Sequence, residues 1–391
     1  MKESNKNIVF LLRVWPFFGG GETVTISLAN EFARRNYGVH VLCFKYTDSK
    51  NALDIDNRIR VQLVEGVDCD ETHANEQDSH VAYSFVLEYI KENKIDIVIN
   101  QWWPVSYIKN IISESTALVV KCNHTALHHP GDINWGGIKG LVKRLFKKQY
   151  IHRLEKRSIS EVDTFLPYVH KYVFLSDRFV EQYFQFARRP QNKQVIAIPN
   201  PLPFNYNTPF FYNEHEKIDE VLFVGRMVDS LKRLSITLNA WVEVEKQESL
   251  NNWKLVVVGD GPDLDSLKEK SKMLGLKRVS FEGFQKPEQY YKRAKVLVQN
   301  SKFEGFGMTI IEAQHFGCVP VAMDTFLTVH DLIKNNENGV IVNDNQNSFT
   351  TALLEIMKDN AKRKRMAYSA IESSSCFNID NICDKWECLF K

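Results

Sequence analysis

The chain has 391 residues, of which 44% are hydrophobic and 25% charged, and its formal net charge at pH 7 is +2. This length exceeds what a single hydrophobic core usually serves, so two domains are expected. The near-balanced charge argues against a nucleic-acid-binding surface. The sequence shows no signal-peptide pattern and no apolar run of about 18 residues, so we expect neither standard secretion nor a membrane span. Seven cysteines without close C-x-x-C pairs favour reduced thiols in a cytoplasmic protein.

Short apolar runs alternate with longer helical patterns along the chain, which is typical of parallel sheets built from β-α-β units. The sequence therefore predicts an α/β fold of two Rossmann-like, doubly wound parallel-sheet domains that face each other across a cleft. A proline-dense, polar stretch at 198–209 predicts the linker between them. The expected strands are 7–14, 39–44, 60–65, 95–100, 117–122, 172–176 and 194–198 in the first half, and 220–224, 254–258, 279–281, 295–299, 319–323 and 339–342 in the second.

Three consecutive glycines, Gly19, Gly20 and Gly21, follow the first expected strand and open a helical pattern. Glycine allows a backbone to approach a ligand where a Cβ atom would block it. Further along, the strand at 117–122 ends in Asn123 and His124, and a neutral imidazole there could orient a hydroxyl group. His128 and His129 follow closely and remain alternatives for that role, and Trp102-Trp103 either stacks on a sugar or packs beneath a loop.

Residues 139–157 interleave basic and apolar side chains at helical spacing. Such a helix can lie on an anionic membrane surface or near a lipid diphosphate. An ordinary helix with a solvated charged face is the alternative.

Two segments of the second half carry charged groups directly after expected strands. Gly225 and Arg226 follow the strand at 220–224, with Lys232 close behind, and a planar guanidinium with an ammonium suits a diphosphate. The stretch from Glu304 to Glu312, EGFGMTIIE, follows the strand at 295–299 and reads as a glycine turn and a helix start. A helix beginning near Met308 and Thr309 would direct unpaired N–H groups at a phosphate, while the two carboxylates could accept hydrogen bonds from vicinal diols. The pattern fits a nucleotide sugar.

With these motifs the chain resembles glycosyltransferase family 4, a family of retaining enzymes with the GT-B fold and an E-x7-E signature in a setting like EGFGMTIIEAQHFGCVPVA. The resemblance implies transfer of a hexosyl unit from a nucleotide diphosphate sugar, with UDP favoured, to a glycan or lipid-linked acceptor in bacterial surface polysaccharide synthesis. It also implies that the last helix, after Phe377, returns to the first domain. The domains would then be 1–200 with 377–391 on the acceptor side, and 201–376 on the donor side.

The resemblance assigns roles to particular positions. The loop before Lys232 is one residue longer than in many family members, which leaves Arg233 as a rival for that role. No dedicated carboxylate nucleophile, metal or cofactor is implied, because the nucleotide sugar is itself a substrate. The implied catalytic residues are Glu304, His124, Arg226 and Lys232, and the implied donor-binding residues are Gly19, Gly20, Gly21, Phe306, Gly307, Met308, Thr309 and Glu312.

The sequence does not match other phosphate- and metal-binding patterns. A dinucleotide fingerprint would need glycine where Val24 and Leu264 stand, and a Walker loop is absent. The Asp-x-Asp pairs at 54–56 and 68–70 lie in polar loop sequence, and Asp263 is expected to cap a helix. Two alternatives of other classes stay open: a non-catalytic nucleotide-sugar-binding partner subunit and a GT-B nucleotide-sugar epimerase.

Overall fold

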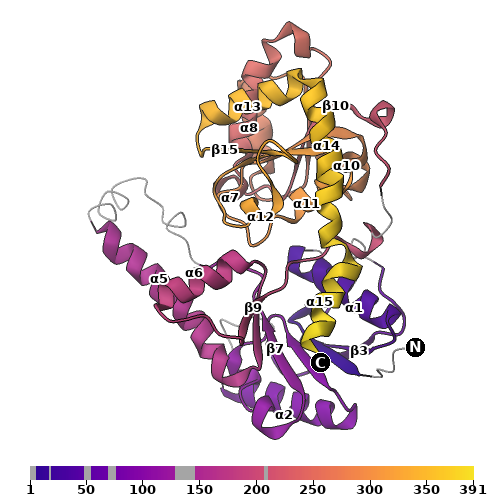
Figure 1. The fold of residues 1–391 in the computed structure, drawn as a ribbon, viewed down its shortest axis with the longest axis vertical. Helices are drawn as coiled ribbons and strands as arrows, with labels where there is room; N and C mark the ends of the chain where they lie inside the picture. The colour runs from indigo at the N-terminus through magenta and orange to yellow at the C-terminus, as the bar shows by residue number, and fades with distance from the viewer. Residues whose placement is uncertain (1–5, 17–18, 48–53, 69–75, 128–145, 207–209) are drawn as a thin grey trace. The chain divides into compact units, whose positions relative to one another are not determined.

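The computed structural model describes residues 6–16, 19–47, 54–68, 76–127, 146–206 and 210–391. The chain forms two compact units: unit 1 contains residues 1–207 and 378–391, and unit 2 contains residues 208–377. Each unit consists of one main parallel sheet with helices around it (Figure 1). The predicted α/β class with two doubly wound parallel sheets is confirmed. His128 and His129 lie outside the described residues, as does the first part of the basic segment, residues 139–145.

Unit 1 is built on a seven-stranded sheet with the order β5-β3-β1-β6-β7-β8-β9. The order reverses at β1, because β3 and β5 extend the sheet on one side and β6 to β9 on the other. The apolar runs NIVFL and IVIN suit central strands that are covered on both faces, and the side chains from Ile8 to Leu12 are fully buried. The strands are β1 (Asn7–Leu11), β3 (Gly38–Cys43), β5 (Arg60–Leu63), β6 (Ile97–Asn100), β7 (Leu118–Cys122), β8 (Lys171–Phe174) and β9 (Val195–Ala197).

The single strand predicted at 7–14 is interrupted. β1 ends at Leu11, and β2 (Val14–Trp15) pairs in parallel with β4 (Lys45–Tyr46) in a separate two-stranded sheet. The carbonyl of Arg13 accepts the N–H groups of both Phe44 and Lys45, so the chain leaves the line of β1 at this residue. The apolar pattern continues through the bend and therefore could not reveal it.

The last helix of the chain belongs to unit 1 and is fastened by charged groups. Glu31, fully buried in α1, accepts hydrogen bonds from Arg34 and Arg35, and Arg35 also donates to Asp384 and to the carbonyl of Asp380 in α15. In Figure 1, α15 lies alongside α1. The helices of unit 1 are α1 (Gly20–Arg34), α2 (Glu76–Glu92), α3 (Ile111–Glu114), α5 (Lys147–Phe165), α6 (Asp177–Ala187) and α15 (Ile379–Leu389), with short 3-10 turns at Val105–Tyr107, Leu166–Tyr168 and Phe204–Tyr206.

Unit 2 contains a six-stranded parallel sheet with the order β12-β11-β10-β13-β14-β15. Here the order reverses between β10 and β13. Because parallel crossovers are right-handed, the helices that follow β10 and β11 lie on one face and those that precede and follow β13 lie on the other. The strands are β10 (Ile218–Val224), β11 (Lys254–Val258), β12 (Val279–Gly283), β13 (Ala294–Gln299), β14 (Val319–Met323) and β15 (Val340–Val342).

Two helix layers complete unit 2. On one layer α8 contacts α9 and α13, and on the other α11 contacts α10 and α14. Trp241, Leu255, Val298 and Phe349 belong to the core cluster between sheet and helices. The helices are α7 (Asp229–Lys232), α8 (Leu234–Glu245), α9 (Leu264–Met273), α10 (Glu288–Arg293), α11 (Met308–His315), α12 (Val329–Leu332), α13 (Gln346–Lys358) and α14 (Asn360–Ser374), with 3-10 turns at Glu214–Glu216, Glu248–Leu250 and Ser375–Phe377.

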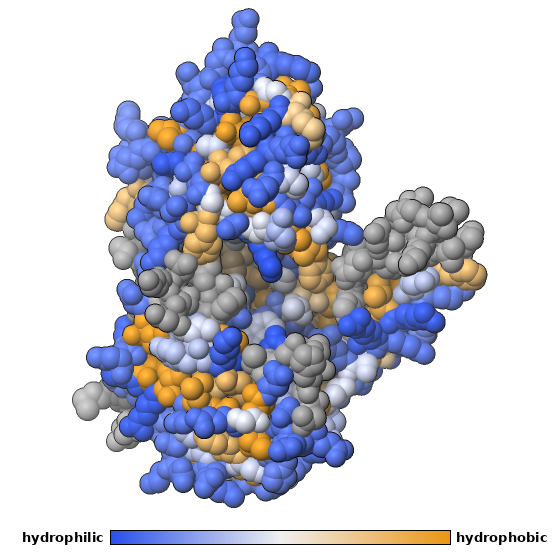
Figure 2. All heavy atoms as spheres, turned by 180° about the vertical axis from the view of Figure 1, so that it is seen from behind, coloured by the Kyte–Doolittle hydropathy of each residue, from blue (hydrophilic) through white to orange (hydrophobic). Residues whose placement is uncertain are grey.

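Hydrophilic residues cover most of the surface seen in Figure 2, with apolar groups between them. Within the described part of the chain, no helix combines the length and the apolar character that crossing a membrane requires. The six cysteines of that part are all free thiols: Cys43, Cys122, Cys318, Cys376, Cys383 and Cys388.

Candidate functional site

The turn between β13 and α11 places Glu304 and the start of the helix at the carboxyl ends of the central strands of the unit 2 sheet. Gly307 is the N-cap of α11, with a left-handed φ of 102°. This φ favours glycine, and a Cβ atom at Gly307 would also lie 3.0 Å from the end of the Leu332 side chain, which would have to shift slightly. The helix starts at Met308, as the sequence predicts, and its first N–H groups have no carbonyl partner within the helix. These groups can bind an anion.

The carboxylate of Glu304 is bound by Lys232 and Gln299. The Lys232 ammonium and the Gln299 amide, the latter at 2.6 Å, both contact Oε1 of Glu304. In the described chain no hydrogen bond reaches Oε2. The side chains of Lys232 and Glu304 are 25% and 15% exposed, so solvent or a ligand can reach both. Gln299 also accepts a hydrogen bond from the hydroxyl of Thr309, at 3.2 Å, which ties the strand end to the helix start.

Lys232 and Arg233 have different surroundings. The aliphatic part of Lys232 lies over Gly225, 3.8 Å from the position of an added Cβ atom, and its ammonium faces Glu304. The Arg233 guanidinium donates to the carbonyl of Asn300 at 2.6 Å and to Asp344 at 2.7 Å. Arg233 therefore joins parts of the fold, whereas Lys232, ion-paired with Glu304, is 25% exposed at the strand ends.

Arg226 follows β10 and is exposed. The structure gives its guanidinium no hydrogen bond or ion pair with another described residue, and it does not join the cluster of Lys232, Gln299 and Glu304. The backbone on either side is nevertheless fixed, because the Met227 N–H donates to the carbonyl of Asp260 at 2.9 Å. Arg226 is thus a free cation on a fixed turn.

The turn at Gly259–Gly261 supports this arrangement. A Cβ atom at Gly259 would lie 1.9 Å from the carbonyl oxygen of Gly225, and one at Gly261 would lie 2.6 Å from that of Met227. Both glycines also have φ above 100°, at 136° and 158°. Only glycine allows the two turns to lie this close.

Asp263 occupies the N-cap position of α9, as the sequence predicts, but it does not cap the helix through its side chain. Its side chain makes no capping hydrogen bond to α9 and instead accepts the N–H of Asp229 at 2.7 Å. Asp263 therefore holds the start of α7, the short helix that carries Lys232. The hydrogen bond to Asp229, which lies far away in the sequence, thus replaces the local capping hydrogen bond.

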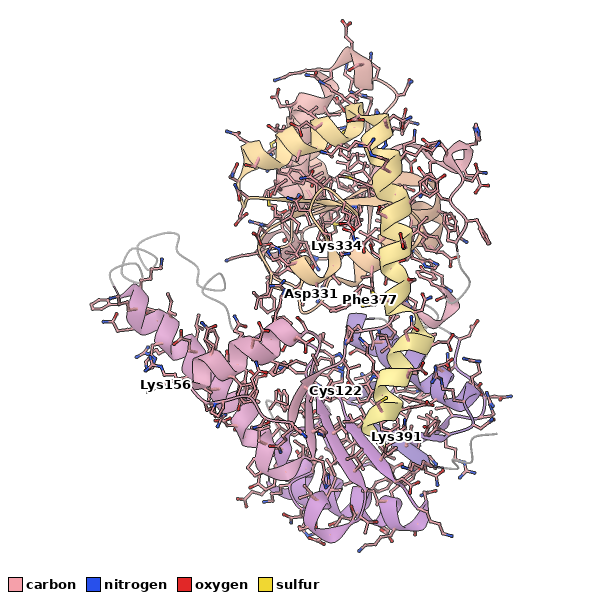
Figure 3. All side chains as sticks on the ribbon, in the orientation of Figure 1. Cys122, Lys156, Asp331, Lys334, Phe377 and Lys391 are labelled. Carbon is pink, nitrogen blue, oxygen red and sulfur yellow. The ribbon has the colours of Figure 1, made fainter. Side chains whose placement is uncertain are left out.

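Glu312 lies on α11, half-buried, and accepts a hydrogen bond of 2.9 Å from the hydroxyl of Tyr291. Burial raises the pKa of Glu312 to about 7, and the Tyr291 hydrogen bond opposes that shift in part. The structure does not bring Glu312 into contact with Glu304. The ring of Phe306 is buried and lies 5.7 Å from the ring of Phe377, which Figure 3 labels. Phe306 can therefore offer a ligand only its backbone.

In unit 1, Gly21 and His124 lie next to each other. A Cβ atom at Gly21 would be 3.5 Å from Cγ of His124 and 3.0 Å from Cζ2 of Trp102, whereas one at Gly20 would meet nothing within 4 Å. Gly19 precedes the helix in an extended conformation. His124 is in contact through Nε2 with Oε1 of Gln101. Burial, helped by the charge of Lys121, lowers the pKa of His124 to about 3, so the imidazole is neutral.

Sequence reasoning missed Gln299, Tyr291 and Gln101. Gln299 and Gln101 share one signal, which is a polar side chain at the carboxyl end of an apolar strand next to the reversal of strand order. Tyr291 carries no such signal, because its contact with Glu312 depends on how α10 packs against α11.

Two family models match the chain. The model described as Glycosyltransferase Family 4 matches residues 18–203, and the one described as Glycosyl transferases group 1 matches residues 207–373. Their boundary falls at the start of unit 2.

Curated relatives and solved structures agree with these matches. The GalNAc-alpha-(1->4)-GalNAc-alpha-(1->3)-diNAcBac-PP-undecaprenol alpha-1,4-N-acetyl-D-galactosaminyltransferase of Campylobacter jejuni is 24% identical over 94% of each chain. The amylovoran biosynthesis glycosyltransferase AmsD of Erwinia amylovora is 29% identical over 50% of this chain and 55% of its own length. The crystal structure of Anabaena HepE in complex with UDP matches with a TM-score of 0.74 at 16% identity, covering 98% of this chain and 99% of that one. The fold is therefore GT-B.

The contrast between Lys232 and Arg233 yields a first prediction. Lys232→Met keeps the aliphatic chain over Gly225 and removes the charge, so the free energy of unfolding should stay within about 1 kcal/mol of wild type. Affinity for a nucleoside diphosphate should fall about 10- to 100-fold, because a charged hydrogen-bond donor is lost. Denaturant unfolding and calorimetric titration with UDP measure the two effects.

Arg233→Met is the matched control. It removes the hydrogen bonds to the Asn300 carbonyl and to Asp344, so stability should fall by about 2 kcal/mol. The reverse pattern, with binding lost in Arg233→Met and kept in Lys232→Met, would assign the diphosphate contact to Arg233.

The raised pKa of Glu312 yields a second prediction. In the unfolded chain this carboxyl loses its proton near pH 4.5, whereas in the folded protein it keeps the proton up to about pH 7. The folded state therefore binds more protons within this window, and its stability decreases as the pH rises from 4.5 to 7. Relative to Glu312→Gln, wild type should lose on the order of 2 kcal/mol across the window, measured by urea unfolding. Parallel curves for the two proteins would show that Glu312 does not titrate there.

Proposed function

We propose that this chain, which belongs to the group 1 glycosyltransferases of the GT-B fold, transfers a hexosyl unit from a nucleotide diphosphate sugar to a glycan or lipid-linked acceptor in surface polysaccharide synthesis. The observation that carries the proposal is the cluster of Glu304, Lys232 and Gln299 at the reversal of strand order in unit 2, beside the start of α11. It combines a cation and free N–H groups for a diphosphate with a carboxylate oxygen that can accept from a sugar hydroxyl.

In this proposal the residues of unit 2 bind the donor. Lys232, Arg226 and the N–H groups of Met308 and Thr309 stabilise the negative charge that develops on the diphosphate as the glycosidic bond breaks. Such preorganised electrostatic stabilisation is usually the largest contribution to catalysis. Glu304 holds hydroxyl groups of the transferred sugar through Oε2, and Glu312 accepts from the ribose diol. Phe306 and Gly307 contribute their backbone.

In unit 1, Gly19, Gly20 and Gly21 contact the diphosphate through their backbone, and His124 contacts the sugar. A neutral imidazole suits this task, because it accepts a hydrogen bond without adding positive charge next to a developing oxocarbenium ion. UDP is the nucleotide we favour, since Anabaena HepE, a structural neighbour, was solved with UDP.

The reaction retains the anomeric configuration and needs no metal in this proposal. A retaining glycosidase sets two carboxyl groups about 5 Å apart across the scissile bond. Glu304 is instead paired with Lys232, and Glu312, on α11, accepts a hydrogen bond from Tyr291 on α10. The leaving diphosphate is stabilised by cationic side chains and backbone N–H groups, which supports metal-independent transfer.

The test begins with a thermal-shift screen of UDP, GDP, ADP and their hexose conjugates. A ligand at 100 times its dissociation constant should stabilise the protein by about 2.7 kcal/mol. We expect a shift that is selective for one nucleotide and weaker in Glu312→Ala, followed by transfer that is lost in Glu304→Gln. NMR of the product should show the donor's anomeric configuration, and EDTA should leave the rate unchanged.

Other results of this test would point to other functions. Nucleotide binding with neither sugar transfer nor donor hydrolysis would indicate a non-catalytic partner subunit. Formation of an epimerised nucleotide sugar in the absence of acceptor would indicate an epimerase. No response to any nucleotide would contradict the donor site itself.

Peripheral contact with an anionic membrane surface through 139–157 is a further part of the proposal. In the described portion, Phe146 is 51% exposed and stands next to a run of exposed basic side chains on α5, of which Lys156 extends outward in Figure 3. The exposed basic residues of α5 are Lys147, Lys148, Arg153, Lys156 and Arg157.

Flotation with vesicles that contain anionic lipid tests this contact. Lys147→Glu with Lys148→Glu should reduce recovery with the vesicles several-fold, because each basic residue near the surface contributes about 1 kcal/mol. Lys364→Glu with Arg365→Glu on α14 of unit 2 changes the net charge equally and should float like wild type. Equal losses in the two double variants would indicate a general charge effect without a specific contact.

A further inference from the structure

Gln101 and Trp102 lie directly after β6, next to the reversal of strand order in unit 1. β7 ends one strand further along at Cys122, labelled in Figure 3, and His124 follows two residues later. We infer that Gln101 and Trp102 form, together with His124, a subsite in unit 1 that binds hydroxyl groups of a hexopyranose ring. The inference rests on the proposed glycosyl transfer and adds two residues to it.

The turn that carries Gln101 and Trp102 is held from several sides. Asn100 and Trp103 exchange two hydrogen bonds, of 2.8 and 2.9 Å, across the turn. The Trp103 indole donates to the carbonyl of Leu12 at 2.7 Å and stacks on the ring of Phe44 at 4.7 Å. Trp103 is thus the packing residue of the pair. Trp102 faces the other way, with its ring 5.3 Å from that of His124 and against Gly21.

Gln101 is fixed by its own main chain. Its carbonyl accepts the Lys121 ammonium at 2.7 Å, and its N–H donates to the carbonyl of Leu11 at 3.1 Å. The side chain of Gln101 contacts His124, and the residue as a whole is only 1% exposed. This is an anchored, buried amide, in contrast to a surface glutamine that water can satisfy.

Three polar atoms of this cluster have no partner among the described residues. They are Nε2 of Gln101, Nε1 of Trp102 and Nδ1 of His124, and each is shielded from solvent. Buried polar atoms are paired in most proteins, so three unpaired atoms on residues in contact with one another indicate a place where a ligand completes the hydrogen bonds.

The chemistry of the three atoms defines the ligand. With Oε1 of Gln101 facing Nε2 of His124, the proton of the neutral imidazole lies on Nε2, and Nδ1 is an acceptor. The amide of Gln101 and the indole of Trp102 are donors. Two donors, one acceptor and an aromatic ring match a sugar, whose hydroxyls both donate and accept and whose C–H groups contact aromatic rings. Gln101 is thus also a positioning residue, because it selects the tautomer of His124.

The hexose at this subsite has two sources, the transferred sugar of the donor or the terminal sugar of the acceptor. Trp102→Phe keeps a ring and removes the indole N–H, and Gln101→Met keeps the volume and removes the amide. We expect kcat/KM to fall about 10-fold in each. Affinity for UDP, which lacks the hexose, should not change.

Coupling to single sugar hydroxyls distinguishes a contact from a general structural defect. UDP-glucose and UDP-galactose, each compared with its 2-, 3-, 4- and 6-deoxy analogue, serve as donor probes, and deoxy forms of the acceptor serve as acceptor probes. In wild type, loss of the contacted hydroxyl should cost about 10-fold, whereas in Trp102→Phe the same loss should cost little. Coupling to a donor analogue identifies the transferred sugar, and coupling to an acceptor analogue identifies the acceptor.

Trp241→Phe is the matched control. Trp241 is a buried tryptophan of the unit 2 core whose indole N–H also has no described partner, so the same atom is removed away from the subsite. This variant should keep the wild-type discrimination among analogues. If the enzyme is active but Trp102→Phe and wild type lose the same factor in kcat/KM with every deoxy analogue, the inference is overturned and the proposed function is not. Absence of turnover in wild type with any UDP-, GDP- or ADP-hexose would overturn the proposed function and the inference together.

Discussion

The reversal of strand order at the centre of each parallel sheet is the constraint on which both groups of site residues depend. Where the order reverses, the helices on the two sides of that point go to opposite faces, and the carboxyl ends of the two central strands stay uncovered. In unit 2 these ends belong to β10 and β13, which brings Lys232 to Glu304 although the two are far apart in sequence. In unit 1 they belong to β1 and β6, which brings Gly21 to Trp102.

The charges in unit 2 are balanced before any ligand arrives. Glu304 has a cation and an amide on one oxygen, and Lys232 depends on that carboxylate as its partner. A diphosphate near Lys232 would share this cation and weaken its hold on Glu304, leaving the carboxylate more able to accept from a sugar hydroxyl. In the proposed function, the two ends of one donor would thereby be coupled through a single ammonium group. The close contact of the Gly259 turn with Gly225 fixes the strand end over which the lysine lies.

The sequence allowed the architecture to be predicted well, because the β-α-β pattern is local and repeated. Each main-sheet strand was expected within a few residues of its observed bounds, and so was the start of α11 at Met308. The misses arose where distant parts of the chain decide the outcome. The bend after β1 depends on the strand that follows Cys43, and Asp263 binds the backbone of Asp229 in preference to its own helix. For the same reason the Tyr291–Glu312 and Gln101–His124 contacts could not be predicted, because each joins residues that lie far apart in the sequence.

The ion pairs between α1 and α15 have a consequence for how the chain can be rearranged. The segment after Phe377 completes unit 1, and Lys6 near one end donates a hydrogen bond to the carbonyl of Phe390 near the other. Unit 2 is therefore an insertion within unit 1, joined at two points, 207/208 and 377/378. Exchange of unit 2 between related chains needs two crossovers. A single fusion after 207 would also replace α15, so Arg35 would lose its ion pair with Asp384.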